Sequence, residues 1–157
     1  MVQQAPTPTK DFYIFKCALI GNQGVGKSSL IESYLNGTFN QNGLPPTKAT
    51  TEHLKDKMQV GNFNIQLKIS EIPAESVMTT GGITANAFVF LVYDVTNQES
   101  FKNLEDYIEN FNSNNKNPNK LLYIIANKCD NASRQVPEEQ GRRAAETYGC
   151  KYFETSA

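Results

Sequence analysis

The stretch Gly21-Asn22-Gln23-Gly24-Val25-Gly26-Lys27-Ser28 matches the phosphate-binding pattern G-x-x-x-x-G-K-[ST]. The apolar run at 14–20 before it predicts a buried strand, and residues 28–36 after it predict a helix. Glycines let such a loop curl so that successive backbone N–H groups face one anion, and the helix N-terminus adds partial positive charge. A glycine-rich turn that merely precedes a helix is the alternative, but the flanking strand and helix favour a phosphate-binding loop.

The loop and the first turn of the helix supply the predicted phosphate contacts. Lys27 is expected to reach the β- and γ-phosphates of a nucleotide, which makes it a candidate catalytic residue. The hydroxyl of Ser28 is expected to ligate Mg²⁺. The predicted nucleotide-binding residues of this segment are Gln23, Gly24, Val25, Gly26, Lys27, Ser28 and Ser29.

The composition is that of one globular domain. The chain has 157 residues, of which 39% are hydrophobic, and a net charge of −1, so a general affinity for nucleic acid or anionic lipid is not expected. Cys17, Cys129 and Cys150 are widely spaced and fit no metal-ligand pattern, which favours buried, reduced thiols in a cytoplasmic protein. No apolar run has the length of a membrane span, and no signal peptide is recognisable.

Alternating strands and helices follow a polar tail at 1–11, which we expect to be flexible because it has little apolar surface to bury. The domain at 12–157 is predicted to be α/β, with a mostly parallel six-stranded sheet that is flanked by helices and binds ligands at the carboxyl ends of its strands. A mobile loop with one helical turn at most is expected at 73–86. The predicted strands are 12–20, 58–60, 63–69, 87–93, 121–126 and 151–153, and the predicted helices are 28–36, 100–111 and 137–148.

Two further motifs follow buried strands at this predicted ligand edge. They are Asn127-Lys128-Cys129-Asp130 and Glu154-Thr155-Ser156-Ala157. With the phosphate-binding loop they make the chain resemble a small GTPase of the Ras superfamily, and the stretch Val92-Tyr93-Asp94-Val95-Thr96-Asn97-Gln98-Glu99-Ser100-Phe101 is similar to the Rab branch. The resemblance covers about 12–157 and implies a P-loop NTPase G domain.

The resemblance assigns guanine recognition to these two motifs. The carboxylate of Asp130 would accept hydrogen bonds from N1–H and the 2-amino group of guanine, a donor pair that adenine lacks. Asn127 would brace the phosphate-binding loop, and the aliphatic part of Lys128 would lie along the purine. The backbone N–H groups of Ser156 and Ala157 would meet the guanine O6. An ordinary polar turn after a strand is the alternative for the first motif.

The first switch of the family is recognisable but irregular here. Phe39 would contact the base by similarity, whereas a loop aromatic that packs on the core is the alternative. Thr47, after a proline, would ligate Mg²⁺ and meet the γ-phosphate. Because this match needs one extra residue, Thr50 and Thr51 remain rivals for that role.

The second switch departs most from the family. Glu71, Ala74 and Glu75 stand where the family has Asp, Gly and Gln, and Pro73 further restricts the backbone. Glu75 is the candidate residue at the position that orients the attacking water, but its carboxylate would repel developing negative charge. We therefore expect slow GTP hydrolysis.

These features lead to a hypothesis and two alternatives. The first is a Rab-like protein that binds GDP or GTP with Mg²⁺, acts in vesicle traffic or signalling, and contacts protein effectors or regulators through 38–52 and 71–86. The second is a non-catalytic, nucleotide-loaded docking module. An ATP-using P-loop enzyme is a third, which Asp130 disfavours. The C-terminal helix and the prenylated tail of the family are not found in this sequence, so it does not encode membrane attachment, although a longer form would be peripheral to membranes.

Overall fold

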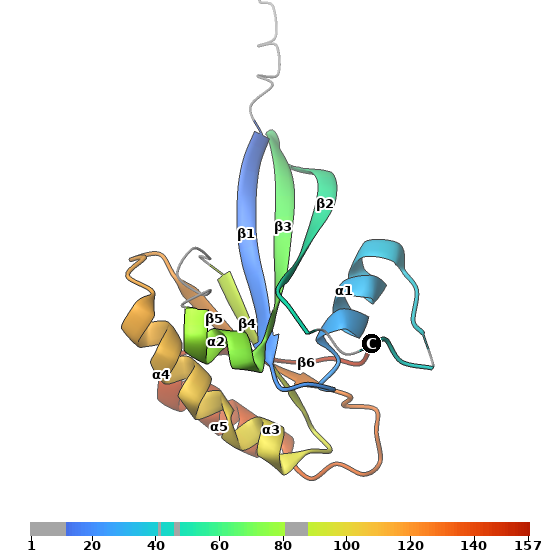
Figure 1. The fold of residues 1–157 in the computed structure, drawn as a ribbon, viewed down its shortest axis with the longest axis vertical. Helices are drawn as coiled ribbons and strands as arrows, with labels where there is room; N and C mark the ends of the chain where they lie inside the picture. Colours follow the sequence, from blue (N-terminus) through green and yellow to red (C-terminus); the bar gives the residue numbers. More distant parts are fainter. Residues whose placement is uncertain (1–11, 41, 46–47, 81–87) are drawn as a thin grey trace, which may run out of the picture.

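The computed structural model describes residues 12–40, 42–45, 48–80 and 88–157, which form a six-stranded sheet with helices on both faces (Figure 1). The strand order is β2-β3-β1-β4-β5-β6, and only the β2–β3 pair of these strands is antiparallel. The predicted mostly parallel α/β sheet is confirmed. The elements are β1 (Phe12–Gly21), α1 (Lys27–Asn36), β2 (Thr51–Val60), β3 (Phe63–Pro73), α2 (Ala74–Thr80), β4 (Phe88–Asp94), α3 (Gln98–Lys102), α4 (Leu104–Asn114), β5 (Leu121–Asn127), α5 (Glu138–Tyr148) and β6 (Lys151–Glu154).

The helices divide the core into two layers, because α1 lies on one face of the sheet while α2, α3, α4 and α5 lie on the other (Figure 1). In the larger layer, Ile108 and Phe111 of α4 pack against strand residues such as Tyr93. In the smaller layer, Ile31 of α1 packs against Cys17 and its neighbours. The apolar spacing of each helix therefore explains which face it covers.

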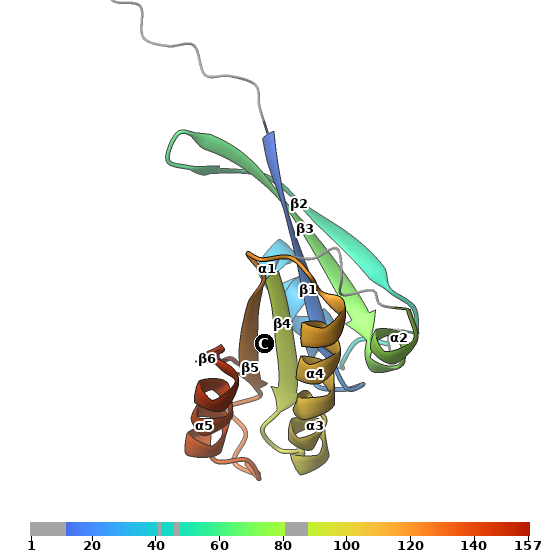
Figure 2. The ribbon, with the colours of Figure 1, turned by 90° about the vertical axis from the view of Figure 1, so that its left-hand side faces the viewer.

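The three strands nearest one edge of the sheet extend well beyond the other three (Figure 2). Strand β1 pairs with β3 from Phe12 onward, whereas its pairing with β4 begins at Cys17. Tyr13 and Phe63 meet edge to face on this extension, with ring centroids 5.5 Å apart, and each is more than half exposed. The extension lies at the amino end of β1, away from the phosphate-binding loop.

The predicted helix at 100–111 is two helices. Asn103 separates α3 from α4, and the side chain of Asn97 caps α3 by accepting hydrogen bonds from the backbone N–H groups of Glu99 and Ser100. The sequence pattern missed this break because Leu104, which follows it, still falls on the buried stripe. The cap fixes the turn that follows Asp94.

The prediction of a loop at 73–86 is wrong for 74–80, where the chain forms α2 directly after β3. Threonines lower helix propensity here, but Val77 is fully buried and Ala74 packs against the core, so tertiary packing outweighs propensity. Pro73, the last residue of β3, directly precedes this helix, where its missing N–H removes no intrahelical hydrogen bond. The remainder of the predicted loop, 81–86, and the tail 1–11 lie outside the described residues.

All three cysteines are free, but only Cys17 is buried; Cys129 and Cys150 are partly exposed, so the expectation of three buried thiols is wrong for these two. Cys129 lies in the segment after β5 and Cys150 directly before β6, so neither is part of a strand. Within the described ranges, no helix has the combination of length and apolar content that crossing a bilayer requires.

Candidate functional site

The phosphate-binding loop leaves the carboxyl end of β1, in the interior of the sheet, and is clamped from β5. Asn127 donates a hydrogen bond from Nδ2 to the carbonyl of Val25 at 2.9 Å. Gly26 adopts φ +97°, and a Cβ there would lie 2.3 Å from Asn127 Nδ2. A side chain at this position is therefore excluded by both conformation and contact. The Val25 side chain points into the core, so any contact of this residue with phosphate is through its backbone.

Lys27 turns back over the loop that precedes it. Its Nζ donates hydrogen bonds to the carbonyls of Gly21 at 2.8 Å and Asn22 at 3.0 Å. Burial lowers the pKa of Lys27, and the negative charges of Glu71 and Glu75 oppose that shift. The ammonium group is thus held at the loop, next to carboxylates, where an incoming phosphate would exchange for the two carbonyls.

The segments 127–130 and 154–157 meet through side-chain and backbone hydrogen bonds. Thr155 Oγ1 donates to Asn127 Oδ1 at 3.1 Å, and Ser156 Oγ donates to Asp130 Oδ1 at 2.6 Å. The backbone N–H of Cys129 also donates to the carbonyl of Thr155 at 3.1 Å. The segment after β6 is therefore fixed against the segment after β5, and Asp130 is held at the surface of the site with a second carboxylate oxygen beside it.

A cavity of about 700 Å³ runs between the phosphate-binding loop and these motifs. Phe39 is 55% exposed at its rim and does not pack in the core. The cavity also contacts Leu44, Pro45 and Lys48, which the sequence did not single out. The predicted site residues along its wall are Gln23, Gly24, Gly26, Lys27, Ser28, Ser29, Phe39, Glu75, Asn127, Lys128, Asp130, Ser156 and Ala157.

Of the three threonines considered for the Mg²⁺ position of the first switch, only two lie in the described part of the chain. Thr47 lies outside the described residues. Thr50 and Thr51 are exposed, and in the described part of the chain neither contributes to the cavity wall. The arrangement as a whole puts a loop that can bind phosphate and a carboxylate that can bind guanine around a single cavity.

A family model described as the Ras family matches residues 16–157. The chain belongs to the Ras family. It is 33% identical to Ras-related protein Rab-8A from Gallus gallus over 153 residues, which cover 92% of this chain and 70% of that protein. It is 34% identical to Ras-related protein Rab-8B from Homo sapiens over the same shares, and 33% identical to Ras-related protein RAB1BV from Beta vulgaris over 92% of this chain and 68% of that protein. Within the Ras family, the chain is Rab-like.

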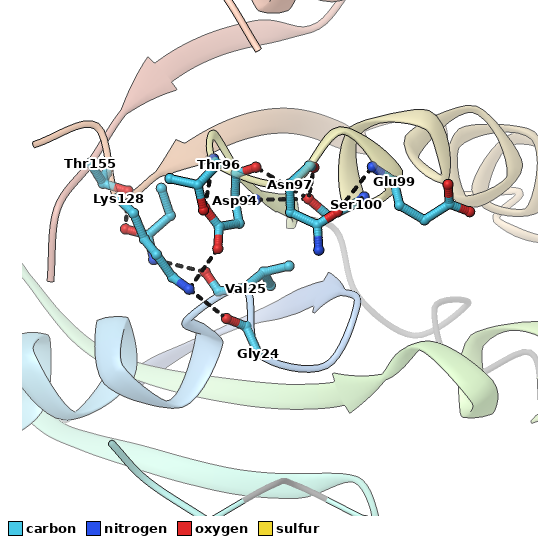
Figure 3. A network of polar contacts seen from close by, with 10 residues as sticks. Gly24, Val25, Asp94, Thr96, Asn97, Glu99, Ser100, Lys128 and Thr155 are labelled. Atoms are coloured by element: carbon cyan, nitrogen blue, oxygen red, sulfur yellow. Dashed lines mark hydrogen bonds and ion pairs between the residues drawn. The ribbon is translucent and has the colours of Figure 1, made fainter. Parts of the chain in front are cut away.

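Lys128 of this Ras-family site contacts both the phosphate-binding loop and Asp94 at the end of β4, two contacts that the sequence reasoning missed (Figure 3). Lys128 Nζ lies 2.6 Å from Asp94 Oδ2 and donates to the carbonyl of Gly24 at 2.8 Å. Burial opposes ionisation of Asp94, but hydrogen bonds from Lys128 and Thr96 outweigh it and hold the pKa of this carboxyl below its ordinary value. The acidic residue at the end of the apolar run Phe88–Asp94 was the signal that could have identified Asp94 as a partner of Lys128.

The Asp94→Asn variant is expected to lose about 1–2 kcal/mol of unfolding free energy at neutral pH, because the charge-assisted hydrogen bond to Lys128 is weakened. Since folding lowers the pKa of Asp94, its contribution exists above the unfolded value near ~4 and disappears as pH falls through the folded value. Urea unfolding at pH 7 and in acid measures this. The unfolding free energies of wild type and variant should converge in acid. An equal difference in unfolding free energy at both pH values would contradict the role assigned to Asp94.

Oxygen donors suited to Mg²⁺ lie where the phosphate-binding loop meets β3. Ser28 Oγ donates a hydrogen bond to Glu71 Oε1 at 2.7 Å, and Glu71 is only 3% exposed. Across the described ranges, no group of three or more His, Cys, Asp or Glu side chains could hold a metal ion alone. A serine hydroxyl and a carboxylate are oxygen ligands of the kind that Mg²⁺ accepts together with water and phosphate oxygens.

A contact from α4 also reaches the phosphate-binding loop of this Ras-family protein. Tyr107 donates a hydrogen bond from its hydroxyl to Asn22 Oδ1 at 2.9 Å. Burial raises the pKa of Tyr107 to about 12, with further increases from the negative charges of Glu75 and Asp106. The hydroxyl therefore stays protonated at neutral pH and remains a donor to the loop. No sequence pattern predicts this long-range contact.

Proposed function

We propose that the chain is a guanine-nucleotide-binding, Rab-like small GTPase that hydrolyses GTP slowly. The observation that carries this proposal is that Lys27 and Asp130 border the same cavity, one at the loop after β1 and the other at the loop after β5. Proteins of the Ras and Rab family in general bind guanine nucleotide and Mg²⁺. Mg²⁺, held by Ser28 and Glu71, would neutralise phosphate charge in this site.

Guanine selectivity follows from the chemistry of Asp130. Its Oδ1 already accepts a hydrogen bond from Ser156, which orients the carboxylate, and an ionised carboxylate can accept but not donate. Guanine presents two adjacent donors to such a group, whereas adenine presents an acceptor at the matching ring nitrogen. The protein is therefore expected to bind GDP or GTP and to reject ADP and ATP.

Slow hydrolysis follows from the start of α2. Glu75 supplies a carboxylate where charge develops on the transferred phosphoryl group, and this disfavours the transition state. Pro73 is buried and Ala74 packs against the core, so this backbone is held in place and cannot easily rotate an N–H toward the γ-phosphate. Both features favour binding over turnover.

The cellular role that we propose is in vesicle traffic or signalling, through contacts of 38–52 and 71–86 with effectors or regulators. A docking module that never turns over is the second candidate, and the anchoring of α2 by Val77 and Ala74 favours it. The identity of the bound nucleotide distinguishes these two proposals from an ATP-dependent enzyme. Denaturing the purified protein and identifying the released nucleotide by chromatography should yield GDP or GTP; a released adenine nucleotide would contradict guanine binding.

The triple variant E71D/A74G/E75Q is expected to raise the single-turnover rate of GTP hydrolysis by about 10²-fold, because one transition-state contact is typically worth ~10²–10³ in rate. The rate is measured on protein loaded with radiolabelled GTP and Mg²⁺. The exposed Glu146→Gln variant is the matched charge control and should leave the rate unchanged. No gain in the triple variant, with nucleotide still bound, would favour the docking module.

A further inference from the structure

The second half of the phosphate-binding loop is held by side chains that follow β5. Asn127 donates from Nδ2 to the carbonyl of Val25 at 2.9 Å, and Lys128 donates from Nζ to the carbonyl of Gly24 at 2.8 Å. Neither contact reaches the first half of the loop, which begins at Asn22 after the last residue of β1. The position of Asn22 is therefore set by other contacts.

Asn22 joins the lysine of the loop to helix α4. Its carbonyl accepts a hydrogen bond from Lys27 Nζ at 3.0 Å, and its side-chain Oδ1 accepts one from the hydroxyl of Tyr107 at 2.9 Å. The chain enters the loop directly against β4, since a Cβ on Gly21 would lie 2.1 Å from the carbonyl oxygen of Val92. A rotation of Asn22 that broke its contact with α4 would consequently also move the carbonyl that orients the lysine.

Tyr107 is itself held rigidly. Its side chain is only 4% exposed and lies in the core layer under α4, together with Ile108 and Phe111. Because the ring is already packed in the folded protein, directing its hydroxyl at the loop costs little additional side-chain entropy. A buried tyrosine hydroxyl that merely satisfies its own hydrogen bond is the alternative, and it predicts no effect on ligand binding.

We propose that Tyr107 is a positioning residue that preorganises the phosphate-binding loop through Asn22 and thereby slows the release of bound nucleotide. This inference rests on the proposed guanine-nucleotide function. Without the hydroxyl, the side chain of Asn22 can turn to water, and the carbonyl beside Lys27 loses its fixed position. Binding of the β-phosphate must then order the first half of the loop, and this cost weakens the complex.

The experiment compares the wild type with Tyr107→Phe, which removes the hydroxyl and keeps the packed ring. Release of fluorescent GDP into excess unlabelled GDP, with Mg²⁺ present, should be about fivefold faster in the variant, the effect of losing one neutral hydrogen bond. Affinity for GMP, measured by competition, should not change, because GMP has no β-phosphate for Lys27 to contact. Tyr148→Phe is the matched control: it removes a hydroxyl that bonds to Glu105 of the same helix α4, and it should leave GDP release unchanged.

A double-mutant cycle tests whether the hydroxyl acts through Asn22. Asn22→Ala removes the side-chain acceptor and keeps the carbonyl that Lys27 contacts, so it should accelerate GDP release by a similar factor. Adding Tyr107→Phe to Asn22→Ala should then cause no further acceleration, because the partner of the hydroxyl is already gone.

The outcomes separate this inference from the function on which it depends. Unchanged GDP release in folded Tyr107→Phe would overturn the positioning role, and so would equal losses of affinity for GDP and GMP. Acceleration by Tyr107→Phe that persists in full in the Asn22→Ala background would contradict the route through Asn22. A wild type that binds ADP and not GDP would overturn the guanine function, and the same release measurements with ADP would then decide the role of Tyr107. Failure to bind any nucleotide would overturn both.

Discussion

The Asp130→Ala variant is expected to bind GDP about 10³-fold more weakly than the wild type or worse, and to lose its preference for guanine over adenine nucleotides. The reason is that two donors of guanine lose their charged acceptor, and sites built on such hydrogen bonds discriminate by 10⁴–10⁵ at the upper end. Phosphate contacts from the loop remain, so residual binding should be similar for GDP and ADP. Calorimetry with both nucleotides measures this.

Two controls separate base recognition from a structural effect. Ser156→Ala removes the hydrogen bond that orients Asp130, and it should cost only about tenfold because the carboxylate remains. IDP lacks the 2-amino group, so it should bind the wild type more weakly than GDP does. In Asp130→Ala, IDP and GDP should bind with equal affinity. A continued advantage of GDP over IDP in Asp130→Ala would show that another group reads the amino group.

The Gly26→Ala variant is expected to abolish nucleotide binding and to lower the unfolding free energy by about 3 kcal/mol or more. A Cβ at φ +97° costs about 1–2 kcal/mol, and its collision with Asn127 Nδ2 adds the cost of overpacking. The collision can be relieved only by moving the clamp between β5 and the loop. Urea unfolding and binding of a fluorescent GDP measure the two losses.

Gly24 provides the matched comparison for stability. It also has a positive φ, +80°, but a Cβ there would meet nothing within 4 Å, so Gly24→Ala should cost about 1–2 kcal/mol from conformation alone. Adding Gly26→Ala to Asn127→Ala should likewise cost only this strain, because the colliding amide is gone. Equal losses for Gly24→Ala and Gly26→Ala would mean that contact with Asn127 is unimportant.

The phosphate-binding loop and most strands could be predicted because their signals are local, but the strand predicted at 58–60 is longer and begins at Thr51. The run before Gly21 is apolar throughout, and the loop pattern has fixed spacing, so neither depends on distant contacts. Helix α5 was equally readable, because its predicted span 137–148 agrees with Glu138–Tyr148, and two i, i+4 ion pairs, Glu138–Arg142 and Glu139–Arg143, add local stabilisation.

The features that could not be predicted depend on tertiary contacts. Helix α2 is stabilised because Val77 is buried between the sheet and α4. Local helix propensity does not include this packing. The Asp94–Lys128 pair joins residues that are distant in sequence and adjacent only because β4 and β5 end side by side. The same holds for the hydrogen bond from Tyr107 to Asn22. The role predicted for Thr47 stays a prediction.

The clamp of Asn127 on the loop couples ligand binding to folding. The loop comes from the first strand of the chain, the clamp from the fifth, and Thr155 behind the clamp from the segment after the last strand. An unfolded or half-folded chain therefore lacks this arrangement, so nucleotide is expected to bind only the native state. By mass action, nucleotide at 1,000 times its dissociation constant would add about 4 kcal/mol to the free energy of unfolding. Thermal denaturation of this protein should consequently shift upward with nucleotide concentration.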